Sequence, residues 1–202
     1  TIPVRWGIGL AVGLVMLPGV VLADRFLLDA LRPDEQSRLV GVMQWGTWLG
    51  YGLVDIVIPL LLGLVAWRRG DREMARRGIL GGLAVTLAGL LGQIVKNLLC
   101  RARPNAGDAG AFFSGFPCFP ASYTLASFPS GHATTAFALA TLLSFWYPRW
   151  TAAWLTLAAF VGWSRIVLGS HFPSDVLGGA VLGVAVVMGF FRWIPGTGKC
   201  KI

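Results

Sequence analysis

The sequence predicts an all-α integral membrane protein, a bundle of six transmembrane helices with both termini on the cytoplasmic side. Hydrophobic residues make up 55% of the 202-residue chain. Its mean hydropathy of +0.69 is well above that of a soluble domain. The apolar residues also gather into segments of roughly the ~20 residues that cross a bilayer core. We expect one domain over residues 1–202.

Six apolar segments follow one another along the chain. They are Ile8–Leu22, Trp48–Trp67, Ile79–Leu99, Gly131–Tyr147, Trp150–Leu168 and Asp175–Trp193. Glycine is frequent within them, which suits close helix packing in lipid. The first segment could also be read as a signal peptide, but Val20–Ala23 lacks a clear small-x-small cleavage site. It is therefore interpreted as a transmembrane helix.

The basic residues predict the orientation of these helices. The connection Arg68–Arg77 holds five arginines against two acids. Five further basic residues fall on the same side: Arg5, Arg149, Arg192, Lys199 and Lys201. An excess of arginine and lysine marks cytoplasmic loops. The connections 24–38 and 101–128 then face the outside.

The net charge of +8 does not indicate nucleic-acid binding, because the basic residues lie between apolar runs and form no basic face. Cys100, Cys118 and Cys200 lack metal-ligand spacing, and we expect neither a metal nor a cofactor. Cys100 and Cys118 fall on the oxidising side. They either pair with each other or remain small hydrophobic residues, while Cys200 is expected to be a free cytoplasmic thiol.

A candidate phosphate site lies where a loop rich in Gly, Pro and Phe gives way to the fourth apolar segment. Ser130 is predicted to cap a helix, with His132 in its first turn. The unpaired N–H groups of a helix start attract anions, and Gly131 permits close approach. Taken alone, this motif is also compatible with an ordinary serine cap and a structural histidine.

Three cations fall near the outer ends of separate segments: Lys96, Arg103 and Arg165. Apart from Asp175, and Asp55 or Asp108, no acid nearby could neutralise them. The missing counter-charge is then a ligand phosphate, which arginine binds through two parallel hydrogen bonds. The alternative is three cations that extend separately to the membrane interface.

His171 and Asp175 are four residues apart at a helix start, so their side chains share one face. A carboxylate bonded to one imidazole nitrogen leaves the other free to attack, which makes His171 a candidate nucleophile. His132 could then act as general acid and base. The alternative for the pair is a buried structural contact, which would not explain the second histidine or the cations.

Together these residues resemble the three signature motifs of the type 2 phosphatidic acid phosphatase superfamily. The motif positions are Lys96, Arg103 and Pro104; then Pro129, Ser130, Gly131 and His132; then Ser164, Arg165, His171 and Asp175. The motif core spans residues 96–175, and the six-span layout resembles the membrane branch.

The resemblance implies a role for each of these residues. His171 would form a phosphohistidine, Asp175 would orient it, and His132 would serve as acid and then base. The phosphoryl oxygens would be held without metal by Lys96, Arg103, Ser130, Gly131 and Arg165.

Two further charged residues are candidates for supporting roles. An intramembrane acid usually faces a partner, so Asp55 is expected to form an ion pair with an arginine near the site. Arg101 either touches a headgroup or is an exposed interfacial charge. The aromatic residues of the long loop 105–128 form either a lid or an interfacial anchor.

The sequence therefore predicts a lipid phosphatase whose partners are membrane lipids and a lipid phosphate substrate. By resemblance, the candidate substrates are undecaprenyl pyrophosphate, phosphatidylglycerophosphate, phosphatidic acid and lipid A phosphates. Two alternatives remain: a lipid phosphotransferase with the same intermediate, and a non-catalytic phospholipid-binding or transport protein.

Overall fold

The structure is a computed structural model that describes residues 4–33, 37–106, 109–114, 118 and 122–194. All regular structure within these ranges is helical. The α-helices are α1 (Val4–Leu31), α2 (Arg38–Gly46), α3 (Gly52–Arg68), α4 (Arg72–Leu99), α5 (Gly131–Trp146), α6 (Thr151–Val167) and α7 (Pro173–Trp193). Short 3-10 turns are η1 (Thr47–Gly50), η2 (Tyr123–Leu125) and η3 (Pro148–Trp150). The predicted all-helical class is confirmed.

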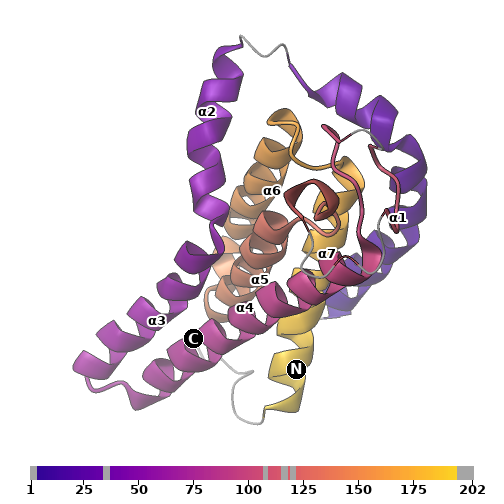
Figure 1. Cartoon of the computed structure of the whole chain (residues 1–202). Coiled ribbons are helices and arrows are strands. Elements are labelled where there is room, and N and C mark those ends of the chain that lie inside the picture. Colours follow the sequence, from indigo (N-terminus) through magenta and orange to yellow (C-terminus); the bar gives the residue numbers. More distant parts are fainter. Residues whose placement is uncertain (1–3, 34–36, 107–108, 115–117, 119–121, 195–202) are drawn as a thin grey trace.

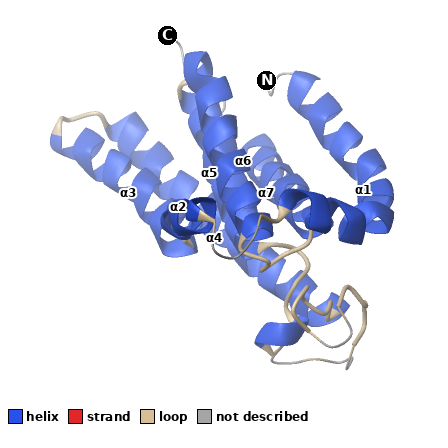
Figure 2. Ribbon diagram, turned by 90° about the horizontal axis from the view of Figure 1, so that it is seen from above, coloured by secondary structure: helices blue, strands red, loops and turns tan. Residues whose placement is uncertain are grey.

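The centre of the fold is α5, whose side chains are mostly buried against α4, α6 and α7. Small residues allow the close approach. A Cβ on Gly179 of α7 would lie 2.6 Å from the Ser130 carbonyl oxygen. Figures 1 and 2 show α1 on one flank of this core, and α3, paired with the N-terminal part of α4, on the other. The helix ends of the core are thereby fixed relative to one another.

Three helices are long and apolar enough to cross a membrane: Arg5–Leu31, Arg72–Leu99 and Pro173–Trp193. A fourth span arises if Arg38–Gly50 and Gly52–Arg68, bent by 50° at their junction, are taken together. The helices α5 and α6 have 16 and 17 residues, fewer than the ~20 of a typical span.

The prediction that residues 24–38 form a loop is wrong. The helix α1 continues to Leu31, and α2 begins at Arg38. The sequence offers alternating acids and arginines here, which look like a solvated connection. Asp24 instead lies on the helix and is 3% exposed, because it has buried partners described below.

Four helix ends meet at one end of the bundle and carry the predicted motifs. Ser130 caps α5, and its hydroxyl accepts a hydrogen bond from the Ala133 N–H at 3.5 Å. Cys100 ends α4 in the left-handed conformation with φ of 45°. The last turn of α6 holds Arg165, and Asp175 lies in the first turn of α7.

Candidate active site

His171 and Asp175 lie together, as their spacing predicts. The imidazole Nδ1 is 3.5 Å from Asp175 Oδ2, and both side chains are buried. The same carboxylate oxygen accepts hydrogen bonds from Ser127 Oγ at 2.6 Å and from the Phe172 N–H at 2.8 Å. The carboxylate is therefore held in one orientation, with one edge towards the histidine.

The buried histidine is neutral at ordinary pH. Burial lowers the pKa of the His171 imidazole to about 3, although the Asp175 carboxylate acts in the opposite direction. Since Nδ1 faces the carboxylate, the geometry assigns the single proton to Nδ1. The other ring nitrogen, Nε2, then carries a free electron pair, as a nucleophile requires. At 3.5 Å the Nδ1 contact is longer than a hydrogen bond, and such contacts often tighten with substrate bound.

Lys96 and Arg103 are oriented by neutral carbonyl groups. Lys96 Nζ donates to the Ala126 carbonyl at 2.8 Å. Arg103 donates to the carbonyls of Tyr123 and Ser170 at 2.8 and 2.9 Å. Its guanidinium carbon also lies 3.9 Å from the centre of the Tyr123 ring. These contacts fix the two cations without cancelling their charge.

Arg165 lies in the last turn of α6. Its Nη1 donates to the Thr47 hydroxyl at 2.6 Å, and its buried Nε has no hydrogen-bond partner. Lys96, Arg103 and Arg165 all lie near enough to His132 to act on it electrostatically. The structure thus brings the three predicted cations together around one histidine.

Ser130, Gly131 and His132 form the start of α5 beside these cations. The peptide bond before the motif, Phe128–Pro129, is cis. The Ser130 N–H donates to the Asp175 carbonyl at 2.9 Å, which joins the starts of α5 and α7. A Cβ on Gly131 would lie 3.9 Å from Lys96 Cε. The helix start and the Lys96 side chain therefore border the same space, with His132 half-buried.

Arg101 is neither a headgroup contact nor an exposed charge, so both expectations for it are wrong. It is 2% exposed. Its Nη1 donates to Asp175 Oδ1 at 2.6 Å and to Ser174 Oγ at 2.7 Å, and its Nη2 donates to Asp24 Oδ2 at 2.7 Å. The guanidinium carbon lies 4.6 Å from the ring centres of both Phe112 and Phe172. Arg101 is the buried partner of two carboxylates.

Sequence reasoning missed Asp24 and Ser127. Asp24 accepts a hydrogen bond from the Ser174 N–H at 2.9 Å and another from the Ser174 hydroxyl. Its place inside the apolar run that begins at Val20 is a signal that could have revealed it, since such acids usually have a partner. No comparable signal marks Ser127.

The predicted ion pair of Asp55 with an arginine is wrong. Asp55 on α3 is fully buried, and neither carboxylate oxygen has a hydrogen-bond partner. It borders a cavity of about 160 Å³ between α3, α5 and α6, lined mainly by apolar side chains such as Leu139 and Val161. The arginines of the site point elsewhere.

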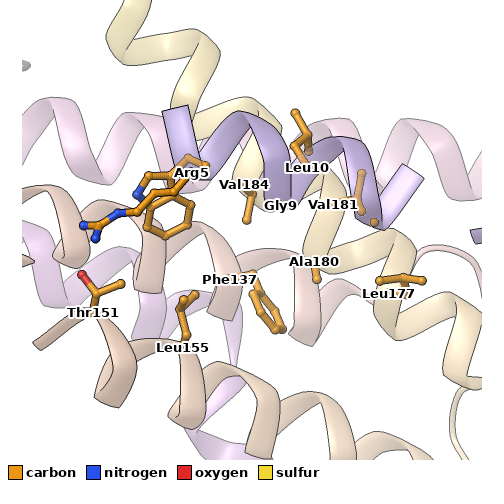
Figure 3. Close-up of a pocket in the computed structure, with 12 residues that line it drawn as sticks. Arg5, Gly9, Leu10, Phe137, Thr151, Leu155, Leu177, Ala180, Val181 and Val184 are labelled. Carbon is orange, nitrogen blue, oxygen red and sulfur yellow. The ribbon is translucent and has the colours of Figure 1, made fainter. Parts of the chain in front are cut away.

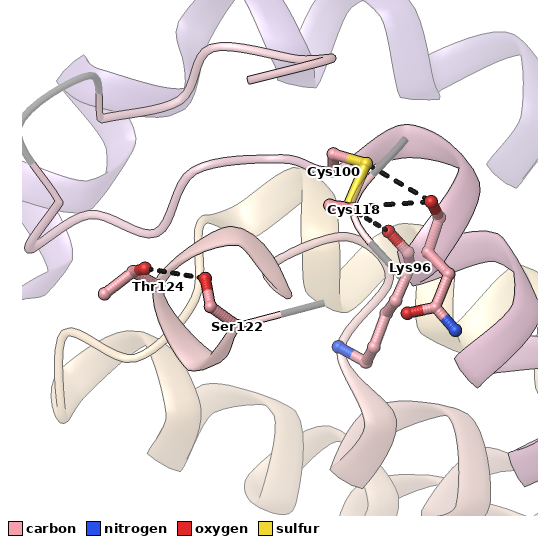
Figure 4. Close-up of a disulfide and its surroundings, with 6 residues drawn as sticks. Lys96, Cys100, Cys118, Ser122 and Thr124 are labelled. Atoms are coloured by element: carbon pink, nitrogen blue, oxygen red, sulfur yellow. Dashed lines mark hydrogen bonds between the residues drawn. A yellow bond between two sulfur atoms is a disulfide. The ribbon is translucent and has the colours of Figure 1, made fainter. Parts of the chain in front are cut away.

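A disulfide joins Cys100 to Cys118 next to Lys96, so the first of the two predicted alternatives is correct (Figure 4). It ties part of the long loop to the end of α4. The loop aromatics Phe112 and Tyr123 cover Arg101 and Arg103. Phe116, Phe119, Asp108 and Cys200 lie outside the described residues. Within the described part of the chain, no cluster of three or more His, Cys, Asp or Glu could hold a metal ion.

Comparison with known proteins agrees with this arrangement. The model of the PAP2 superfamily matches residues 78–199, which contain every motif position described above. The chain belongs to the PAP2 superfamily. The matched range covers the histidines, the cations and Asp175 that the structure brings together at one end of the helical bundle.

The PAP2 relatives include named lipid phosphatases. Lipid A 1-phosphatase of Rhizobium etli is 36% identical over 99 residues, which is 49% of this chain and 42% of that protein. The chain thus spans less than half the length of that relative. Decaprenylphosphoryl-5-phosphoribose phosphatase of Mycobacterium tuberculosis is 35% identical over 169 residues, 83% of this chain and 84% of that protein. The crystal structure of Aquifex aeolicus LpxE superposes with a TM-score of 0.64 at 26% identity, covering 84% and 95% of the two chains.

Proposed function

We propose that this PAP2 protein is a metal-independent phosphatase that hydrolyses a phosphate monoester or pyrophosphate on a membrane lipid. The observation that carries the proposal is the group of three cations around His132 with only neutral oxygen partners, next to a neutral, buried His171. A phosphate would supply the missing negative charge. The names of the lipid phosphatase relatives support a lipid substrate.

The proposed reaction has two steps. In the first, His171 Nε2 attacks phosphorus, the bond to the lipid oxygen breaks, and His132 gives that oxygen a proton. In the second, His132 takes a proton from water, and the resulting hydroxide oxygen displaces Nε2 from phosphorus and releases phosphate. Asp175 keeps the Nδ1 proton in place throughout.

Charge in both transition states develops on the phosphoryl oxygens. Lys96, Arg103 and Arg165 are oriented before the reaction begins, so they stabilise that charge with little reorganisation. Ser130 and the Gly131 N–H, at the start of α5, are proposed to hold a further oxygen.

We further propose that the single domain crosses the membrane six times, with α2 and α3 together forming one span and α5 and α6 short spans within the bundle. Lys96, His132, Arg165 and Asp175 lie at one end of the helices, and the arginine-rich connection 68–77 lies at the other. From the distribution of basic residues we infer that the end with the connection 68–77, together with both termini, is cytoplasmic. The active site then faces the periplasm or cell exterior of a bacterial cytoplasmic membrane.

The test is phosphate release in detergent, with EDTA present, from the four candidate lipids. Wild type is compared with His171→Ala and His132→Ala, and with Arg69→Gln on the far connection as a matched control. We expect release in EDTA that both histidine variants abolish and the control retains. Each variant's unfolding temperature is measured in parallel, so that loss of activity is separated from loss of fold.

Several outcomes would contradict the proposal. Release that stops in EDTA would show a metal requirement, and release that persists in His171→Ala would mean that His171 is not the nucleophile. Phosphorylated acceptor in place of free phosphate would identify a phosphotransferase. Lipid binding without turnover in wild type would indicate a binding or transport protein.

A further inference from the structure

An apolar groove runs between α1 and the core (Figure 3). No predicted catalytic residue lines it. Its volume is about 370 Å³, within the range of protein ligand pockets. Side chains of α1, α5, α6 and α7 line it, including Leu10, Phe137, Leu155 and Val181. We call this space the α1 groove.

The groove lies between two of the contacts that α1 makes with the core, both in the N-terminal half of the helix. At one point Gly13 packs so closely that a Cβ would lie 2.7 Å from Val181 Cγ2. At the other, the Trp6 ring meets Phe145 edge to face, 5.7 Å between ring centres. Gly9 lies between these contacts, and a Cβ there would have no neighbour within 4 Å. The gap is therefore open space that no side chain of α1 fills.

One end of the groove is positively charged. Arg5 and Thr151 lie together there, and they are the exceptions in an otherwise apolar lining (Figure 3). The acids of the connection between α3 and α4 are already engaged: Glu73 pairs with Arg77 at 2.9 Å, and Asp71 accepts from the Met74 N–H at 2.9 Å. Among the described residues no acid pairs with Arg5.

This charged end is far from the predicted phosphatase site. Arg5 lies at the start of α1, whereas Asp24, near its other end, joins the network around Asp175. Thr151 likewise begins α6, and Arg165 lies in its last turn. A ligand with its anionic group on Arg5 therefore occupies a different site from the substrate and enters from the opposite leaflet.

We propose that the α1 groove binds an anionic glycerophospholipid, with its phosphate on Arg5 and one acyl chain along Gly9, Phe137 and Val181. Two observations point to this ligand. The lining is apolar, so a hydrocarbon chain fits it better than water does. The cation has no acid partner among the described residues, and on the topology proposed above it lies at an interface where anionic lipids gather around basic residues. The bound acyl chain would also hold α1, the helix that carries Asp24, against the core.

The binding test counts lipids that stay bound to the purified protein. The full chain is reconstituted with equal amounts of phosphatidylglycerol and phosphatidylcholine, and bound lipid is measured by native mass spectrometry. Wild type is expected to retain phosphatidylglycerol about fivefold over phosphatidylcholine, the preference that one arginine near an interface provides. Equal retention of the two lipids would overturn the assignment of the headgroup to Arg5.

Two variants separate the two parts of the ligand. Gly9→Leu fills the groove and should abolish retention of both lipids, while Arg5→Gln should remove only the preference for phosphatidylglycerol. The matched control is Gly19→Leu on the same helix. A Cβ on Gly19 also has no neighbour within 4 Å, but Gly19 does not line the groove. This control should behave as wild type.

Unchanged binding in Gly9→Leu would overturn the groove as the site. A change from dimer to monomer in Gly9→Leu would show that a second copy of the chain covers the groove, and would also overturn the proposal. Phosphate release is measured on the same samples. Failure of the proposed phosphatase function would appear there in wild type, whereas failure of the lipid proposal would appear only in the lipid count.

Discussion

Arg101 and Arg103 stand two residues apart and have opposite electrostatic surroundings. Arg101 is held between the carboxylates of Asp24 and Asp175. Arg103 is held by backbone carbonyl groups and one tyrosine ring. The first charge is neutralised by acids inside the protein, and the second is the one that the proposed function assigns to a ligand phosphate. Removing a buried cation that has acid partners leaves uncompensated charge, whereas a buried cation with neutral partners still has its charge available to an anion.

The strongest test of this comparison is Arg101→Ala. Removal of one partner from a buried ion pair leaves uncompensated charge and typically costs ~3–5 kcal/mol. Here two carboxylates, Asp24 and Asp175, would be left. We expect a fall of that size in the free energy of unfolding, measured by thermal or denaturant unfolding in detergent, together with loss of activity. Unfolding indistinguishable from wild type would contradict the role assigned to Arg101.

Arg103→Ala should have the opposite profile. On the proposed function it removes a preorganised donor to the phosphoryl oxygens, so kcat should fall about 10²–10³-fold, while the unfolding temperature changes little because no acid loses its partner. Phosphate release and unfolding are measured on the same preparation. Equal loss of stability in the Arg101 and Arg103 variants would mean that the two arginines do not differ in role.

The motif resemblance singled out Arg103, but the sequence did not reveal that Arg101 is a buried ion-pair partner. Their local surroundings are alike, and the partner of Arg101 that separates them, Asp24, lies 77 positions earlier in the chain. Ordered motifs at helix ends were sufficient to predict that Lys96, His132, Arg165 and His171 meet. The long-range partners depended on where α1 ends, and apolar periodicity does not define that boundary near mixed charges. Asp55 shows the same limit, since the residues that surround it are apolar and carry no charge signal.

A smaller effect is expected for Asp24→Asn. The amide oxygen can still accept from Arg101 and the Ser174 hydroxyl, but the amide nitrogen then faces the Ser174 N–H and one negative charge is lost, so we expect a loss of about 1–3 kcal/mol of stability. In the Arg101→Ala background, Asp24→Asn should lower the free energy of unfolding by less than it does in wild type. There it removes one of the two carboxylates that have lost their arginine partner. A double-mutant cycle measures this coupling. Simple additivity of the two changes would argue against a shared network.

The smallest effect is the pH dependence that comes from His171. Burial lowers its pKa to about 3 in the folded protein, from an ordinary value of 6.5. Between these values the unfolded chain binds a proton that the folded protein does not, so stability falls as the pH drops below 6.5. From pH 6.5 to 5.5 the loss attributable to His171 should be about 1 kcal/mol. His171→Asn should flatten this part of the stability curve, whereas Arg103→Ala should retain it. If stability depends on pH equally steeply in His171→Asn, other groups cause the acid response. The pKa of His171 would then not be lowered by burial as described.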